Sequence, residues 1–134
     1  MVNIYDDIYI FAEQYIRTNS IYSPQILADS PQESKVFPLV VITQTEDILE
    51  DENLDKTNQE SIVIFEIEIF AKDTDTTARQ IIIQELKELV DTVFNAHYGF
   101  ERASCRPIPN ADRNISRFYM RYTALVDENK KIRR

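Results

Sequence analysis

Two glutamates have the spacing that could support chemistry. Glu66 and Glu68 lie two residues apart in an alternating apolar segment, so on a strand both carboxylates would project from one face. Such a pair could hold a metal ion for a nuclease or another hydrolase. Arg117 and Arg121 favour a second interpretation, in which these four side chains form cross-strand ion pairs or contacts between subunits.

The other reactive residue types occur singly. His97 is the only histidine and Cys105 the only cysteine, so a zinc site or a nucleophile–histidine triad lacks its parts. We expect His97 near a helix end, where the helix dipole favours a cation, and Cys105 as a small core side chain. Gly99 is the only glycine, which excludes glycine-rich phosphate loops. We therefore expect no enzyme, no catalytic residue, no metal and no cofactor.

Acidic residues are concentrated in the segment Thr45 to Glu60. Its acids, apart from Glu60 itself, are Glu46, Asp47, Glu50, Asp51, Glu52 and Asp55, against the single base Lys56. The ligand spacing and central glycine of an EF-hand are absent, so a calcium site is disfavoured. We expect a self-repelling, flexible acidic loop over about 45–60.

Composition limits the class of protein. The 134 residues suit one domain, 1–134, and 43% hydrophobic with 28% charged residues is typical of a folded soluble chain. A net charge of −8 disfavours binding to free nucleic acid or anionic membranes. The lone cysteine and the lack of a signal-peptide pattern predict a cytoplasmic origin, and no apolar run approaches the roughly 20 residues that span a bilayer.

Hydrophobic periodicity predicts six elements. In chain order they are a helix over 3–17 capped by Asn3, strands over 36–43 and 61–72, a helix to about His97 capped by Asp73, Thr74 or Asp75, and strands over 100–106 and 115–126. The stretch 18–35 is expected to be irregular, 107–114 to be a turn, and the charged tail 127–134 to fray. Gly99 is expected to end the second helix.

This order predicts an α+β fold. The α-β-β-α-β-β arrangement gives a four-stranded, mainly antiparallel sheet with two helices packed on one face. The other face would carry a mixture of acids, arginines and large apolar groups. Its residues would be Ile64, Glu66, Glu68, Phe70, Arg117, Tyr119 and Arg121. We expect it to bind a partner.

Several segments together resemble the tail terminator, or tail-completion, family of long-tailed bacteriophages, also described as head-to-tail joining or minor capsid proteins. The resemblance covers most of the chain and is one of pattern. It includes the strand Phe37-Pro38-Leu39-Val40-Val41-Ile42, the strand Ile64 to Phe70, the helix with Ala78-Arg79, and Pro107-Ile108-Pro109-Asn110 leading to Ser116-Arg117-Phe118-Tyr119-Met120-Arg121-Tyr122. The proline-rich turn before the aromatic and arginine strand is its most telling part.

The resemblance implies a non-catalytic structural protein of the virion. Members of the family cap the head-proximal end of the tail tube, commonly as a six-fold ring, and join tail to head. The expected partners are further copies of the chain, the tail tube protein and head-neck connector proteins, while DNA passes through without specific binding and no membrane is involved. The protein would be made in the host bacterial cytoplasm and end in the virion tail.

The sequence leaves alternatives open. The acidic loop could face the central channel, face a partner ring, or become ordered only on assembly. Another neck or head–tail connector component would suit the same fold. Two alternatives belong to other functional classes. One is a metal-dependent nuclease that uses Glu66 and Glu68, and the other is an intracellular adaptor with a partner groove on the sheet.

Overall fold

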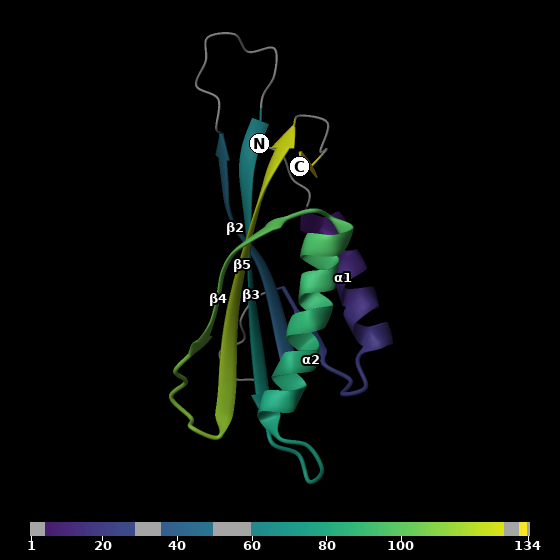
Figure 1. Cartoon of the computed structure of the whole chain (residues 1–134), viewed down its shortest axis with the longest axis vertical. Coiled ribbons are helices and arrows are strands. Elements are labelled where there is room, and N and C mark those ends of the chain that lie inside the picture. Colours follow the sequence, from purple (N-terminus) through teal and green to yellow (C-terminus); the bar gives the residue numbers. More distant parts are fainter. Residues whose placement is uncertain (1–4, 29–35, 50–59, 128–131, 134) are drawn as a thin grey trace.

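The fold combines a sheet with helices that pack on one of its faces. The computed structural model describes residues 5–28, 36–49, 60–127 and 132–133. Figure 1 shows an elongated molecule in which α1 and α2 lie side by side on the same face of a long, twisted sheet. The predicted α+β class and the placement of both helices on one face are therefore confirmed.

Helix α1 spans Tyr5–Asn19 and buries the stripe Ile8, Ala12 and Ile16, as its periodicity predicts. Its first residue also fixes it to the sheet, because the Tyr5 hydroxyl donates a 2.7 Å hydrogen bond to the Ile42 carbonyl. The predicted cap, Asn3, lies outside the described residues.

Within the described residues the sheet has six strands, so the prediction of four is wrong. They are β1 (Gln25–Leu27), β2 (Leu39–Leu49), β3 (Glu60–Lys72), β4 (Glu101–Ile108), β5 (Ile115–Asp127) and β6 (Ile132–Arg133). The spatial order is β1-β2-β3-β5-β4, with β6 paired to β5. Among the strand pairs in the described part of the chain, only β1–β2 is parallel. The four predicted strands form the contiguous part β2-β3-β5-β4 of this order.

Several boundaries differ from the sequence prediction. The stretch 18–35 contains β1, which a hydrogen bond from the Gln25 amide to the Pro38 carbonyl helps to hold. Strand β2 continues to Leu49, so the first third of the expected acidic loop is strand. Strand β4 includes Pro107 and Ile108, which shortens the turn, and β6 shows that the tail does not simply fray. A proline in this segment is typical of an edge strand or of a strand start. Pro38 directly precedes β2, which is an interior strand, so the strand-start alternative is the one that holds.

Helix α2 spans Arg79–Asp91 and continues as the π-helix η1 over Thr92–His97. Ala78, rather than one of the predicted side-chain caps, occupies the N-cap position, and it is exposed. The Asp73 carboxylate nevertheless accepts a 2.7 Å hydrogen bond from the Arg79 amide, so it satisfies a first-turn donor from outside the helix. Gly99 has a φ of 79°, which suits the predicted helix end.

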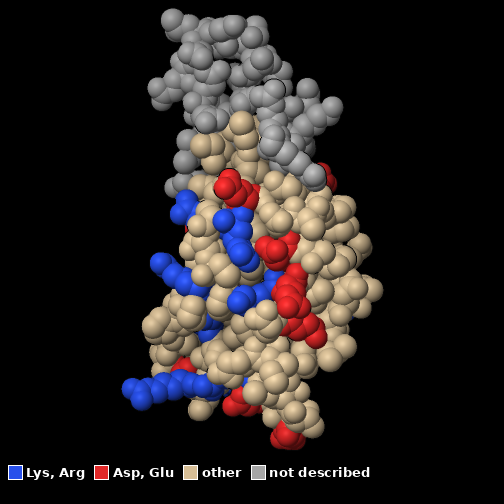
Figure 2. Space-filling model, viewed as in Figure 1, with Lys and Arg blue, Asp and Glu red and all other residues tan. Residues whose placement is uncertain are grey.

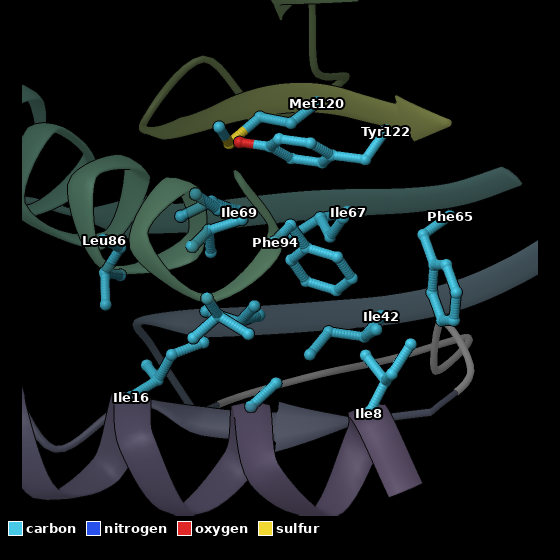
Figure 3. Packing of buried hydrophobic residues seen from close by; sticks show 14 of the residues in the cluster. Ile8, Ile16, Ile42, Phe65, Ile67, Ile69, Leu86, Phe94, Met120 and Tyr122 are labelled. Carbon is cyan, nitrogen blue, oxygen red and sulfur yellow. The ribbon is translucent and has the colours of Figure 1, made fainter. Parts of the chain in front are cut away.

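The core lies between the helices and the sheet. On β3, Val63, Phe65, Ile67, Ile69 and Ala71 are fully buried, which confirms the alternation predicted for this strand. Phe65 contacts Phe94 and Phe100 with ring centroids 5.3 and 5.5 Å apart, and Phe94 stacks on Tyr122 at 5.1 Å. Figure 3 shows the side chains of both helices directed toward those of the sheet. These contacts fix which sheet face is left uncovered by helices.

Candidate functional site

The sheet face opposite the helices carries the residues predicted as a partner surface. Strands β3 and β5 pair in an antiparallel register that places Glu66 opposite Arg121, Glu68 opposite Tyr119 and Phe70 opposite Arg117. Residues that alternate with the buried set project to this second face. We call Glu66, Glu68, Phe70, Arg106, Arg117, Tyr119 and Arg121 the open face.

The firmest contact on the open face is a bidentate ion pair. Arg117 donates from Nε to Glu68 Oε2 at 3.1 Å and from Nη2 to Glu68 Oε1 at 2.6 Å. Its guanidinium carbon also lies 5.3 Å from the centre of the Phe70 ring. The guanidinium is thus held by a carboxylate diagonally across the pair and by an aromatic ring directly opposite. The predicted cross-strand ion pairing is confirmed for these two residues.

Glu66 interacts differently from Glu68. Burial raises the pKa of the Tyr119 hydroxyl, and the nearby Glu66 carboxylate, to which the hydroxyl is hydrogen-bonded, raises that pKa further. The Arg106 guanidinium lies 5.6 Å from the centre of the Tyr119 ring. Among the described residues, Glu66 and Arg121 form no ion pair, and the Arg121 Nε is buried without a hydrogen-bond partner.

Ile64 does not provide accessible apolar area on the open face. Its side chain projects to this side but is only 4% exposed, and Leu39 and Val41 on β2 are 2% and 3% exposed. The single chain therefore leaves little of Ile64 accessible, whereas Phe70 and Tyr119 remain partly accessible. That any of these side chains meets a neighbouring subunit stays a prediction.

The two glutamates do not have the environment of a metal site. Both oxygens of Glu68 accept hydrogen bonds from Arg117, and Glu66 is engaged by Tyr119. Within the described part of the chain, no group of three or more histidine, cysteine or acidic side chains is close enough to hold a metal ion. The geometry of this pair favours a structural role.

The residues of the predicted acidic loop fall into two groups. Glu46 and Asp47 belong to β2, where they pair with Ile64 and Val63 of β3. Glu50, Asp51, Glu52 and Asp55 lie outside the described residues. The prediction that this segment faces a channel or a partner remains untested.

His97 and Cys105 both have structural surroundings. The His97 ring stacks on Phe11 at 4.1 Å, which joins the end of η1 to α1, and meets Tyr98 edge-on at 4.7 Å. Cys105 lies opposite Met120 in the β4–β5 pair and packs against the core while partly exposed. Their predicted structural interpretations agree with these contacts.

Sequence reasoning missed a polar cluster beneath α2. The Tyr122 hydroxyl donates a 2.8 Å hydrogen bond to Asp91 Oδ1, and the Arg102 guanidinium lies 3.8 Å from the same oxygen. Burial, together with the hydrogen bond to Asp91, raises the pKa of the Tyr122 hydroxyl far above its ordinary value. The alternation of β5 placed Tyr122 on the core face, but nothing in the sequence pointed to its partner on α2.

A groove beside α2 was also missed. It has a volume of about 590 Å³ and lies between the first half of α2 and the end of the β4–β5 hairpin. Its helix side is formed by Gln80, Ile83, Gln84 and Lys87. Their spacing at i, i+3, i+4 and i+7 is a signal for one helix face, although polar residues on such a face are more typical of a solvent-facing surface. Figure 2 shows basic side chains gathered beside acidic ones in the region of α2 and β4.

No helix of the described residues is both long and apolar enough to cross a membrane. Comparison with protein families and with curated proteins gives no match. Among solved structures, the chain is similar to one from the virion of a native gene transfer agent particle, with 16% identity and a TM-score of 0.49. The similarity covers 87% of this chain and 91% of that one. At this level the similarity is limited to the overall arrangement of helices and strands.

Proposed function

We propose that this chain is a structural virion protein that caps the head-proximal end of a phage tail tube as a ring, with six copies as the expected number, and joins tail to head. The proposal assigns the chain no catalytic role and no cofactor. Its partners would be its own copies, the tail tube protein and the head-neck connector proteins. It rests on the sequence resemblance to tail terminators and on the open face.

The observation that carries the proposal is the open face itself. Both helices cover the opposite side of the sheet, and this side presents half-buried aromatic rings among arginines and glutamates. A ring requires one patch to meet a different patch on the next copy, and mixed charges fix the register of such a contact. The Arg117–Glu68 pair holds part of this surface in place before association, which lowers the entropic cost of assembly.

The order of the elements also supports the proposal. Strands β2 and β3 and the β4–β5 hairpin form from the segments that carry the resemblance, and α2 follows the segment Asp73 to Ala78. A different neck or head–tail connector component would have the same architecture, because a fold alone does not assign a position in the particle. The virion origin of the similar solved chain is compatible with both roles but does not carry either.

Light scattering over a concentration series, with negative-stain images of the largest species, tests the proposal. The expected result is a closed ring of one size. Arg121→Glu should prevent the ring while the monomer stays folded, since it reverses a charge of the open face that would fix the register between copies. Arg17→Glu is the matched control, because Arg17 lies on α1 with its side chain 53% exposed. It should leave ring formation intact.

Two results would count against the proposal. If the chain stays monomeric at every concentration and also fails to bind isolated tails that lack their terminator, the capping role is wrong. If it binds neck fractions of the particle but never tail ends, the connector role replaces it. Rings that form equally well from the Arg121→Glu variant would remove the open face from the contact.

A further inference from the structure

The groove beside α2 combines apolar walls with amide groups. Ile83, Ile108 and Phe118 contribute apolar surface, and Pro107 and Pro109 line it from the β4–β5 hairpin. The side-chain amides of Gln80, Gln84 and Asn110 also line the groove. Amide groups can donate to and accept from the backbone of an extended peptide, while the apolar walls accommodate its side chains.

The charge of the groove is of one sign. Among the described residues that line it, the ionisable ones are Lys87, Arg113 and Arg117, and none is acidic. Arg117 is already paired with Glu68. The Lys87 ammonium lies 4.2 Å from the centre of the Phe118 ring, and neither Lys87 nor Arg113 has an acidic partner within the described residues. In a chain of net charge −8, a groove with two uncompensated cations is suited to an acidic occupant.

The chain itself contains a segment of matching chemistry. Residues 50–59 include four acids and one lysine, and Leu54 is the one large apolar residue among them. We infer that this groove binds residues 50–59 of a second copy of the chain, with the acids near Lys87 and Arg113 and Leu54 against the apolar wall. The contact would supply one subunit interface of the proposed ring, and to that extent it rests on the proposed function.

The same copy cannot supply the segment. Residues 50–59 join Leu49 of β2 to Glu60 of β3, whereas Phe118, the nearest groove residue along β5, pairs with Ile69. Ile69 lies nine residues further along β3 than Glu60, a distance of about 30 Å. A connection of this length, anchored at both ends, extends at most about 18 Å from them. Figure 1 shows these ends of β2 and β3 at the opposite end of the long axis from the β4–β5 hairpin.

A contact between opposite ends of two copies is heterologous. One patch meets a different patch, so the association repeats from copy to copy and either closes into a ring or continues as a filament. The open face and the groove then have separate tasks. The open face meets the side of a neighbour, and the groove receives the segment that joins the neighbour's β2 and β3.

Fluorescence anisotropy with a labelled synthetic peptide of residues 50–59 tests the inference. The full-length chain is titrated at concentrations where light scattering finds it monomeric. We expect saturable binding that weakens as salt is raised, because exposed charges are screened. The double variant Lys87→Glu/Arg113→Glu should weaken binding about tenfold, the effect of losing roughly two surface ion pairs. The control Arg17→Glu/Lys72→Glu makes the same charge change outside the groove and should bind like the unaltered chain.

A second peptide separates charge recognition from nonspecific attachment. Replacing Glu50, Asp51, Glu52 and Asp55 by their amides keeps the size of the peptide and should abolish binding. The inference is overturned if the native peptide does not bind, if both peptides bind equally, or if the two double variants lose binding equally. Rings without peptide binding would overturn this inference alone, whereas peptide binding without rings would count against the proposed function alone.

Discussion

Arg117 binds Glu68 through two hydrogen bonds that cross from β5 to β3 on the face away from the helices. The two residues are diagonal neighbours rather than direct partners, because Phe70 lies opposite Arg117 in the register. A guanidinium that forms two hydrogen bonds to one carboxylate and also lies over an aromatic ring has little conformational freedom. This contact therefore stabilises the register of the central strand pair and also holds charges in place on the open face.

Removal of the Arg117–Glu68 pair should destabilise the single chain modestly. The side chains are 31% and 20% exposed, so solvent screens part of the attraction. We expect a coupling free energy of about 1 kcal/mol between the two residues. A double-mutant cycle with Glu68→Gln, Arg117→Gln and the double variant, measured by urea unfolding, checks this value. Additive effects of the two single changes would show that the pair does not contribute to stability.

Tyr122 should make the stability of the chain sensitive to alkaline pH. The pKa of its hydroxyl is raised in the folded state by burial and by the hydrogen bond to Asp91. The unfolded chain therefore releases this proton at lower pH than the folded chain does. The stabilisation is complete below the ordinary tyrosine pKa of about 10 and is lost as pH rises toward the folded-state value.

Tyr122→Phe removes this group and keeps the ring that stacks on Phe94. We expect the variant to lose about 1 kcal/mol of unfolding free energy at neutral pH, because Asp91 loses a hydrogen bond. Its stability should then fall less steeply than that of the unaltered chain above about pH 10. Denaturant unfolding at a series of pH values measures both effects. Parallel pH profiles would exclude Tyr122 as the cause of the alkaline loss.

The parts of the fold that could be predicted are those in which side-chain period and burial agree. The alternation from Val63 to Ala71 identifies β3, because one face of this strand packs against the helices and is uniformly apolar. Strand β1 could not be found in this way. Three residues carry too little periodicity, and their strand conformation depends on hydrogen bonds to a segment more than ten residues away, such as that from Gln25 to Pro38.

The sequence predicts which sheet face carries the residues of the candidate site, but it does not predict how buried each of them is. The alternation of side chains along a strand predicts that Ile64 lies on the same face as Glu66 and Glu68, and the observed β3–β5 register agrees with this prediction. The 4% exposure of Ile64 depends on neighbours across two strands, which a single sequence does not provide. The Asp91–Tyr122 contact and the groove were missed for the same reason, because each joins α2 to strands far away in the chain.

Two adjacent isoleucines on α2 give a direct test of which helix face packs on the sheet. Ile82 is fully buried, whereas Ile81 is 58% exposed. Ile82→Ala should cost about 2–5 kcal/mol of unfolding free energy through lost burial and a cavity. Ile81→Ala should change stability by no more than about 0.5 kcal/mol, since it lies on the surface and alanine favours the helix. Similar losses for both variants in thermal unfolding would mean that α2 is rotated from the orientation described above.

Substitution of Ile64 should mainly affect the stability of the monomer, whereas substitution of Phe70 should mainly affect association. Ile64 is already buried in the single chain, so Ile64→Ala should lower the unfolding free energy by about 2–4 kcal/mol at concentrations where the chain is monomeric. Phe70 is partly accessible beside Arg117, so Phe70→Ala should cost the monomer less and weaken association more.

The two variants can be compared by urea unfolding at low concentration and by light scattering at high concentration. Because free energies of folding and of association are measured separately, a variant that is merely unstable is not mistaken for one that cannot assemble. Association weakened by Phe70→Ala, in a monomer of nearly unchanged stability, would place the partner against the Phe70 ring. Unchanged association in that variant would show that neighbouring copies do not meet at this part of the open face.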